Sequence, residues 1–388
     1  MSGRGESRPV MTGRAPDRLA VSRPGFWRGL RLIAALELRQ RMRSRALLVL
    51  AIVWFVIIGA VTLLAWATLS AMLGAAGAET DGYPLFSLIV AFVLLFGTLV
   101  APAISAGSIG AERGQATLAT TQVTLIGLWQ ILLGKALAAW ITGIAFLVIA
   151  APFVVFSLLL SGTGAAQLCL ALVALALQIG VFTAIGVGLS AMIRSQVFAI
   201  VMAYLMVALL SVGTLIGFAL ASGVTTSYHE VENRAFTSEY YAATAECTDE
   251  ACWQAVPEEC ETRIDRVPYV PTDRLWWILA LNPYVVVADM VPPQLDRYRT
   301  PNDLFGGIAY TVRSLQQAPA APTGWNDCAP ENRVPLEVDP TDEVFESTVP
   351  VWWIGFGLQL LLVAGALWGG YRRLDTPAKR LPRGSRIA

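Results

Sequence analysis

The sequence predicts an all-α polytopic membrane protein with six transmembrane helices, an N-terminal interfacial helix and a mixed extracytoplasmic domain between helices 5 and 6. Three observations predict this fold. The 388-residue chain is 55% hydrophobic and only 14% charged, whereas a soluble domain carries about 25% charged residues. Apolar runs recur that are long enough to cross a ~30 Å hydrocarbon core, which takes about 20 residues. Basic residues gather at the two ends of the chain, and acidic residues gather in one long segment.

The first 45 residues hold eleven arginines and divide into two parts. Residues 1–24 are polar and basic, and we expect a disordered cytoplasmic terminus. Residues 25–45 place apolar side chains, such as Phe26, Leu30 and Ile33, at helical spacing among the arginines. This pattern is typical of an amphipathic helix that lies in the membrane interface. The alternative is that the segment merely extends the first span inward.

Six apolar segments are the predicted spans. An arginine at the centre of a membrane helix costs about 2.5–3.5 kcal/mol, so Arg194 divides the long apolar block after residue 164 into two helices joined by a turn. Pro102 and Pro152 fall inside spans, where neighbouring helices can satisfy the freed carbonyls. The first five predicted spans are residues 46–73, 84–109, 136–160, 165–192 and 197–222. Together they make a membrane region 46–222, which contains a cytoplasmic loop at 110–135. The sixth predicted span is the apolar run 351–371, within a transmembrane helix at 350–371.

One further apolar stretch, residues 275–288, is too short to cross a membrane and is broken at Asn282-Pro283. Its Trp276, Trp277 and Tyr284 suit the membrane–water boundary, where amphipathic rings collect. We therefore expect an interfacial or re-entrant segment over 275–291. A seventh span would also put the two basic ends of the chain on opposite sides of the membrane.

Charge sets the expected orientation. Twenty of the 28 Lys and Arg residues, but only five of the 28 acids, lie on the side of the termini, in the N-terminal segment, the loop 110–135, the turn at Arg194 and the tail 372–388. The long segment 223–349 carries 21 acids and eight arginines. Short loops rich in Lys and Arg stay in the cytoplasm. We therefore expect a multi-pass protein of the bacterial cytoplasmic membrane with both termini in the cytoplasm and residues 223–349 outside.

Four of the five cysteines, Cys247, Cys252, Cys260 and Cys328, lie in the external segment. An even number on the oxidising side favours two disulfides, and three connectivities are open. Zinc is the alternative, but the spacing is not that of a zinc finger and His229 is the only histidine. We expect no metal site.

The chain lacks the motifs of nucleotide-binding and catalytic proteins. Gly134-Lys135 is followed by Ala136 rather than Ser or Thr, and the first glycine of a P-loop is missing. None of the predicted spans has an acidic or basic residue near its centre, although ion-coupled transporters normally need such residues. The sequence therefore predicts no catalytic residue, no cofactor and no energy source within this chain.

Short motifs in the expected cytoplasmic segments carry a family resemblance. From the end of the second span the chain reads Ile104-Ser105, Glu112-Arg113-Gly114, Thr117-Leu118, Thr121, Thr124, Trp129-Gln130-Ile131 and Gly134-Lys135. In order and spacing these motifs resemble the permease subunits of the ABC-2 class of ABC transporters, as do Glu37-Leu38-Arg39, the turn at Arg194-Ser195 and Asn282-Pro283-Tyr284. The resemblance covers most of residues 25–373 except 223–274 and 292–349, and it departs from the family at Val123, where many members have proline.

The resemblance implies an ATP-driven exporter in which this chain forms the translocation path in membrane lipid. It implies pairing with a second copy or a homologous permease, two separate ABC ATPase subunits that bind ATP and Mg, and no nucleic-acid partner. The resemblance assigns ATPase coupling to Glu112, Arg113, Gly114, Thr117, Leu118, Trp129, Glu37 and Arg41. Polar side chains of the second and fifth spans are expected to line the path: Ser87, Thr98, Tyr204, Ser211 and Thr214.

Other interpretations stay open. The chain can instead be a membrane-anchored sensor or assembly protein whose acidic external domain binds a partner, whereas a lipid-modifying enzyme is disfavoured because no ionisable residues converge in the membrane. Locally, Glu112 can cap a short helix without any role in coupling. Small polar side chains in spans commonly hold helices together. The sequence does not name a substrate.

Overall fold

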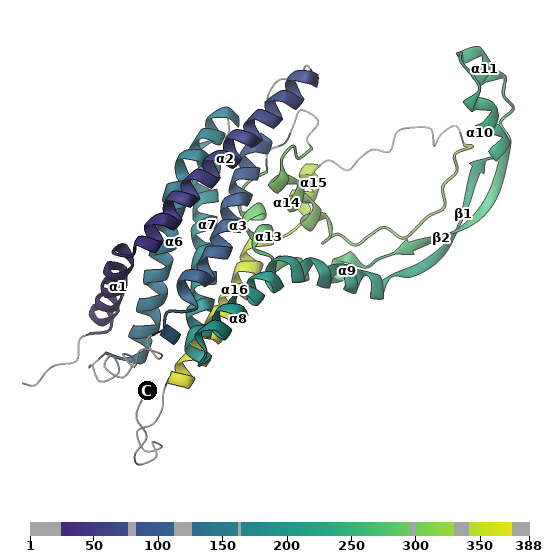
Figure 1. Ribbon diagram of the computed structural model, residues 1–388. Helices are drawn as coiled ribbons and strands as arrows, with labels where there is room; N and C mark the ends of the chain where they lie inside the picture. The colour runs from purple at the N-terminus through teal and green to yellow at the C-terminus, as the bar shows by residue number, and fades with distance from the viewer. Residues whose placement is uncertain are drawn as a thin grey trace, which may run out of the picture.

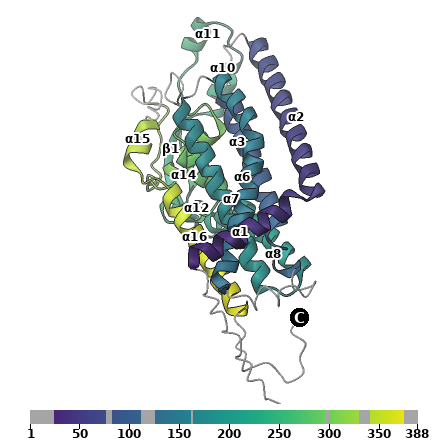
Figure 2. The same ribbon diagram turned by 90° about the vertical axis from the view of Figure 1, so that its left-hand side faces the viewer.

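The computed structural model describes residues 25–76, 83–111, 126–161, 164–293, 295, 300–329 and 341–374. Within these ranges six helices are long and apolar enough to cross a membrane, which confirms the predicted fold class and number of spans. The long helices form one tilted bundle (Figures 1 and 2). The six segments are Arg45–Met72, Pro84–Ser105, Leu128–Ser161, Ala165–Met192, Gln196–Thr225 and Trp352–Leu374.

The elements follow the apolar pattern of the sequence. A separate helix, α1 (Phe26–Met42), lies across the lower end of the bundle and precedes the first span (Figure 2). The spans are α2 (Arg45–Ala76), α3 (Tyr83–Ser105), α6 (Leu128–Ser161), α7 (Ala165–Met192), α8 (Gln196–Ala208) with α9 (Thr214–Thr225), and α16 (Trp352–Leu374). Pro102 and Pro152 lie inside α3 and α6 without ending either helix, as expected.

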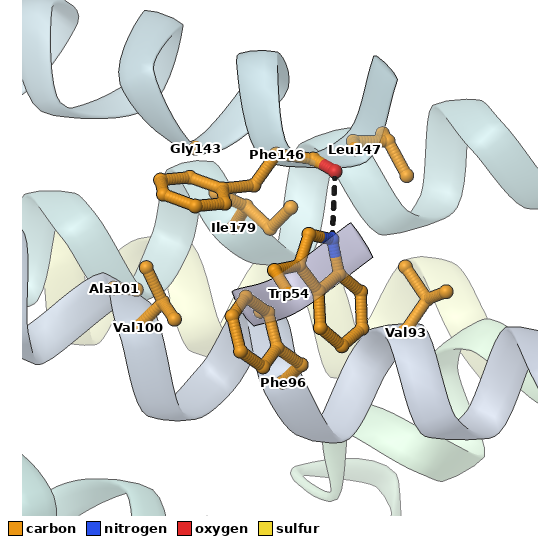
Figure 3. Close-up of a pocket in the computed structure, with 10 residues that line it drawn as sticks. Trp54, Val93, Phe96, Val100, Ala101, Gly143, Phe146, Leu147 and Ile179 are labelled. Atoms are coloured by element: carbon orange, nitrogen blue, oxygen red, sulfur yellow. Dashed lines mark hydrogen bonds between the residues drawn. The ribbon is translucent and has the colours of Figure 1, made fainter. Parts of the chain in front are cut away.

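The core of the bundle centres on α7, which packs against α3, α6 and α16. α2 lies at the edge of the bundle, and its Trp54 and Ile58 are buried in the core. The Trp54 ring stacks on Phe96 at a centroid distance of 3.6 Å, and its indole N–H donates to the carbonyl of Phe146 at 3.1 Å (Figure 3). A buried indole N–H needs such an acceptor. The void beside Trp54 is only about 10 Å³, too small for a ligand.

The third span is longer than the sequence predicts. α6 begins at Leu128 rather than at Ala136 and includes Lys135, which we had placed at the end of a loop. The helix continues through this residue because the Lys135 ammonium is paired with the Glu37 carboxylate of α1. The second span differs at its other end, since α3 ends at Ser105 rather than at Ile109.

The fifth span is not a regular helix. A π-helical turn, η1 (Leu209–Gly213), separates α8 from α9, and the α9 half leans away from the other spans (Figure 1). A π-turn inserts one extra residue into the helix and often marks a functional site. The predicted turn before this span is present, with the Ser195 hydroxyl accepting the Phe198 amide at the start of α8.

The segment 275–291 does not form a seventh span. It folds as two short helices, α12 (Trp277–Ala280) and α13 (Pro283–Met290), and the break falls at Asn282-Pro283. The Asn282 side chain caps α13 by accepting the Tyr284 amide at 2.9 Å. Val287 and Ala288 are fully buried in the main core. The helices therefore enter the bundle between the spans.

The remaining segment between α9 and α16 forms an arm and a set of short helices. In the arm, β1 (Ser227–Phe236) pairs antiparallel with β2 (Cys260–Tyr269), with Ser227 opposite Tyr269, and the hairpin projects well away from the bundle (Figure 1). The short elements are α10 (Ser238–Ala245) and α11 (Glu250–Ala255) at the tip of the arm, η2 (Thr272–Arg274), α14 (Leu304–Ser314) and α15 (Thr341–Ser347).

Two disulfides tie the arm. Of the three open connectivities the structure has Cys247–Cys252 at the tip and Cys260–Cys328 between β2 and the returning chain. The returning chain also lies beside β1, where the Arg234 amide donates to the carbonyl of Trp325 at 2.9 Å. These links are needed because an isolated two-stranded hairpin is marginally stable in water.

Candidate functional site

The first candidate site is the contact between α1 and the start of α6. Two glycines allow the helices to approach closely: a Cβ at Gly134 would lie 2.8 Å from Ile33 Cγ2, and a Cβ at Gly29 would lie 2.8 Å from Gln130 Cδ. Contacts below about 3.0 Å force a neighbour to move. At each glycine, the backbone of one helix therefore packs directly against a side chain of the other helix. This close contact fixes α1 on α6.

Gln130 fastens the first turn of α1 to α6. Its side-chain amide donates to the carbonyl of Phe26 at 3.2 Å and to the carbonyl of Gly25 at 3.4 Å. Its Oε1 accepts the Gly127 amide at 2.7 Å, which also caps the start of α6. One buried side chain thus satisfies backbone groups on both elements.

A buried charge cluster joins the other end of α1 to α6. The Glu37 carboxylate pairs with the Lys135 ammonium through Oε1, and Arg41 Nε lies 3.8 Å from its Oε2. The Lys135 side chain is 3% exposed and that of Glu37 is 10% exposed. Lys135 Nζ also lies 3.5 Å from the carbonyl of Ser108, just after α3. The cluster therefore links α1, α6 and the end of the second span.

Arg41 is the less satisfied cation of this cluster. Its burial lowers the pKa of the guanidinium below its ordinary value, and the Glu37 carboxylate opposes that shift. The guanidinium stays charged in the folded protein, because arginine is not deprotonated in proteins. Burying a charge is tolerated only when partners surround it.

The expected coupling residues are only partly brought together. Glu37 and Arg41 share the charge cluster, but Trp129 lies apart from it and stacks on Tyr371 of α16 at a centroid distance of 4.9 Å. Lys135 belongs to the cluster, although the sequence shows it only as part of the Gly134-Lys135 motif at the end of a loop. Five expected residues lie outside the described residues: Glu112, Arg113, Gly114, Thr117 and Leu118.

The start of the loop after α3 is anchored on α7. The amides of Ile109 and Gly110 both donate to the hydroxyl of Ser190, at 3.1 and 3.3 Å. Ser190 lies in the last turn of α7, close to the Arg194 turn. The loop is therefore attached both to α7 and, through Ser108, to the charge cluster.

The second candidate site is a cavity of about 900 Å³ that is open to the surroundings, with exposed side chains such as Leu95, Tyr204 and Val212 in its wall. Its walls come from α3, from α8 and α9 around the π-turn, and from α12, α13 and α14. Most lining side chains are apolar. Three of the five expected path residues line it: Thr98, Tyr204 and Ser211.

The other two expected path residues hold elements together. The Ser87 hydroxyl accepts the Leu304 amide at 3.1 Å and so caps α14 against α3. The Thr214 hydroxyl accepts from the Asn282 side chain at 3.0 Å and donates to the carbonyl of Leu210 at 2.9 Å. Neither side chain lines the cavity, and their place on a translocation path stays a prediction.

A chain of side-chain amides crosses the bundle to the cavity. The Gln178 amide of α7 donates to Gln359 Oε1 of α16 at 3.0 Å, and Gln359 donates to the carbonyl of Leu281 at 3.1 Å. The adjacent Asn282 amide donates to the carbonyl of Ser211 in the π-turn at 2.7 Å. A π-turn frees such a carbonyl from its helical partner. The sequence signal for these residues was an amide inside an apolar run.

A buried ion pair closes the far side of the cavity wall. Asp289 of α13 is paired with Arg313 of α14, with Nε 2.6 Å from Oδ1. Its other oxygen accepts the amides of Val351 and Trp352, at 2.6 and 3.0 Å, at the start of α16. Arg313 also donates to the carbonyl of Phe345 in α15 at 3.3 Å. One carboxylate therefore holds the ends of three helices, and Arg313 adds a fourth.

In the part of the chain that the structure describes, no three His, Cys, Asp or Glu side chains are grouped as metal ligands. The chemistry of the two candidate sites is therefore that of packing, ion pairing and an apolar cavity. Among the described residues of the two sites, no nucleophile is held beside a base.

Comparison with known proteins identifies the family. Residues 31–257 match the family described as ABC-2 family transporter protein. No curated protein sequence matches the chain. The family match covers more than half of the 388 residues and runs from α1 through five of the spans into the arm. The chain therefore belongs to the ABC-2 transporter membrane family.

Proposed function

We propose that the chain is the membrane-spanning permease subunit of an ATP-driven exporter, and that it has no catalytic activity of its own. Two ABC ATPase subunits hydrolyse ATP beside the basic ends of the chain, in the cytoplasm of a bacterium, and two permeases pair in the membrane. The observation that supports this most directly is the buried Glu37–Lys135 pair, because it joins the interfacial helix rigidly to the bundle.

The rigid α1–α6 unit gives the mechanism. An ATPase that pushes on α1 and on the adjoining loop moves α6 and the end of α3 with them, because Lys135 contacts both Glu37 and the carbonyl of Ser108. The fifth span can bend at its π-turn, which lines the cavity. Movement of packed helices against one another is the usual way such a push opens or closes a path. Glu112 in the loop is the proposed contact to the ATPase.

The cavity supports the proposal that this chain forms the translocation path. Thr98, Tyr204 and Ser211 place two hydroxyls and a phenol on a mostly apolar wall, whose other polar side chains are Asn282, Tyr284, Asp303 and Thr311. Such a wall suits an amphipathic molecule, since ligand sites combine apolar surface with a few polar groups. A strongly hydrophilic cargo would desolvate its polar groups here without compensation.

The experiment is purification of the tagged full-length chain with its ABC ATPase, followed by reconstitution in nanodiscs. We expect ATP hydrolysis by the complex. Glu112→Ala is expected to reduce the coupling of hydrolysis to transport, whereas the charge-neutral change Gln115→Ala in the same loop leaves it unchanged. If no ATPase accompanies the chain, and Glu112→Ala leaves transport at the wild-type rate, the proposal is wrong and the sensor or assembly function takes its place.

Orientation has its own test. With Cys169 replaced by Ser, we expect an impermeant thiol reagent to label Gln115→Cys only from the cytoplasmic side. The same reagent is expected to label Thr323→Cys, on the returning chain of the arm, only from outside. The reverse pattern would contradict the proposed orientation.

A further inference from the structure

A mostly apolar groove lies between the α1–α2 turn, the start of α2 and α6, and it shares no lining residue with the cavity of the proposed path. Its volume is about 290 Å³. Side chains from the two spans make its walls, and Arg41 and Ser44 lie at the end next to the interfacial helix. The lining residues that the argument uses are Arg41, Ser44, Ala51, Ala145 and Phe146.

The groove is bounded at its deep end by the attachment of α2. Phe146 lines the groove, and its carbonyl accepts the Trp54 indole N–H, one turn of α2 beyond Ala51 (Figure 3). The end of α2 next to α1 stands away from α6 (Figure 2). The groove therefore runs along the two spans from the α1–α2 turn towards the middle of the membrane.

The entrance to the groove is positively charged. Arg41 lines it, and Arg43 and Arg45 lie beside it on exposed positions of the turn. Glu37, the only acid of α1, lies 3.8 Å from Arg41 through one oxygen while its other oxygen is held by Lys135. The first turn of α2 has no acid. The guanidinium of Arg41 therefore faces a groove entrance that contains cations and hydroxyls.

We propose that this groove binds an anionic phospholipid from the leaflet next to the basic ends of the chain. One acyl chain lies between α2 and α6, and the phosphate accepts hydrogen bonds from Arg41 and the Ser44 hydroxyl. A guanidinium fork matches phosphate geometry, and its hydrogen bonds to an anion are strong. Two parts of one ligand thus satisfy the two parts of the site, the apolar walls and the cationic entrance.

Other occupants fit less well. A free phosphate ion would leave the apolar walls empty. A zwitterionic phospholipid would fill the walls but would bring its own cation to a cationic entrance.

The test is native mass spectrometry of the purified full-length chain titrated with phosphatidylglycerol or with phosphatidylcholine of the same acyl chains. We expect one phosphatidylglycerol to bind about tenfold more tightly than phosphatidylcholine. Both lipids carry a phosphate, so the preference comes from the choline cation that only phosphatidylcholine brings to the cationic entrance. Arg41→Gln removes one charge of that entrance and one charge-assisted contact to phosphate, and we expect it to weaken phosphatidylglycerol binding about tenfold and to reduce the preference. Arg31→Gln removes the same charge from an exposed position of α1 away from the groove and is expected to keep the preference.

A second pair of variants tests the walls. Ala145 is exposed to the groove, so Ala145→Phe fills it without disturbing the core, and we expect binding of phosphatidylglycerol to weaken at least tenfold. Val148→Phe adds the same bulk to a lipid-facing position of α6 outside the groove and leaves binding unchanged. Equal retention of the two lipids by the wild type, or binding that Ala145→Phe does not weaken, would overturn the proposal. An Arg41→Gln variant that behaves as Arg31→Gln would do the same.

Discussion

Asp289 offers the sharpest test of how the cavity wall is held. Its side chain is 1% exposed and accepts from Arg313 and from the amides of Val351 and Trp352. Asp289→Asn keeps the size of the side chain but removes its charge. The amide can still accept a hydrogen bond at the start of α16, so the main loss is the ion pair with Arg313.

The size of the expected loss of stability depends on the contacts that Arg313 keeps in the Asp289→Asn variant. Removing one partner of a buried pair costs about 3–5 kcal/mol, because the other charge is left without compensation. Arg313 is 11% exposed and retains the carbonyl of Phe345 and a position 5.0 Å from its ring. We therefore expect Asp289→Asn to lower the free energy of unfolding by about 3 kcal/mol, near the lower limit of that range.

A double-mutant cycle separates the pair from the helix ends. Arg313→Met should also cost about 3 kcal/mol, and the double variant should cost at least about 2 kcal/mol less than the sum of the two single changes. The assay is unfolding of the purified chain in mixed detergent and SDS micelles, followed by tryptophan fluorescence. Costs that add within about 0.5 kcal/mol would show that the two side chains do not act as a pair.

Two further predictions concern α1 and the arm. Gly134→Val is expected to release α1, because its new side chain would collide with Ile33, and trypsin should then cut α1 at least about tenfold faster. The control Gly25→Ala, which has open space around it, should leave the cleavage rate unchanged. Equal cleavage rates for the two variants would refute the close packing of α1 on α6. Cys260→Ser opens a disulfide between residues 68 apart and should destabilise the arm by about 4 kcal/mol, against about 2 kcal/mol for Cys247→Ser. Protease resistance of the arm shows which variant is the less stable. A less stable arm in Cys247→Ser than in Cys260→Ser would contradict the loop-closure reasoning.

The sequence predicts the spans well because a bilayer imposes a length and an apolar composition on every crossing helix. The helix boundaries predicted from the sequence are wrong where a charged side chain is paired with a residue far along the chain. Lys135 looks like the end of a loop until Glu37, 98 residues away, supplies its counter-charge. Asn282-Pro283 was more informative than Lys135 about where a helix begins. A proline and a capping side chain act on the neighbouring backbone, so they predict the break between α12 and α13.

The candidate sites were harder to predict. Gln178 and Gln359 lie 181 residues apart, and the sequence shows two amides in apolar runs without showing that they meet. Asp289 and Arg313 likewise read as solvated charges of an external segment. Polar side chains such as Thr98 and Thr214 look alike in the sequence, yet one lines the cavity and the other bonds to Asn282. Only the packing of the helices distinguishes the two roles.

The most direct measurement of the central claim is a distance across the cavity in the working complex. With Cys169 replaced by Ser, nitroxide labels at Val212→Cys beside the π-turn and Leu304→Cys at the start of α14 report the separation of two cavity walls. We predict that ATP with vanadate shifts this distance in nanodiscs that contain the ABC ATPase and not in nanodiscs with the permease alone. A distance that is the same in every nucleotide state would contradict the account of a permease moved by a separate ATPase.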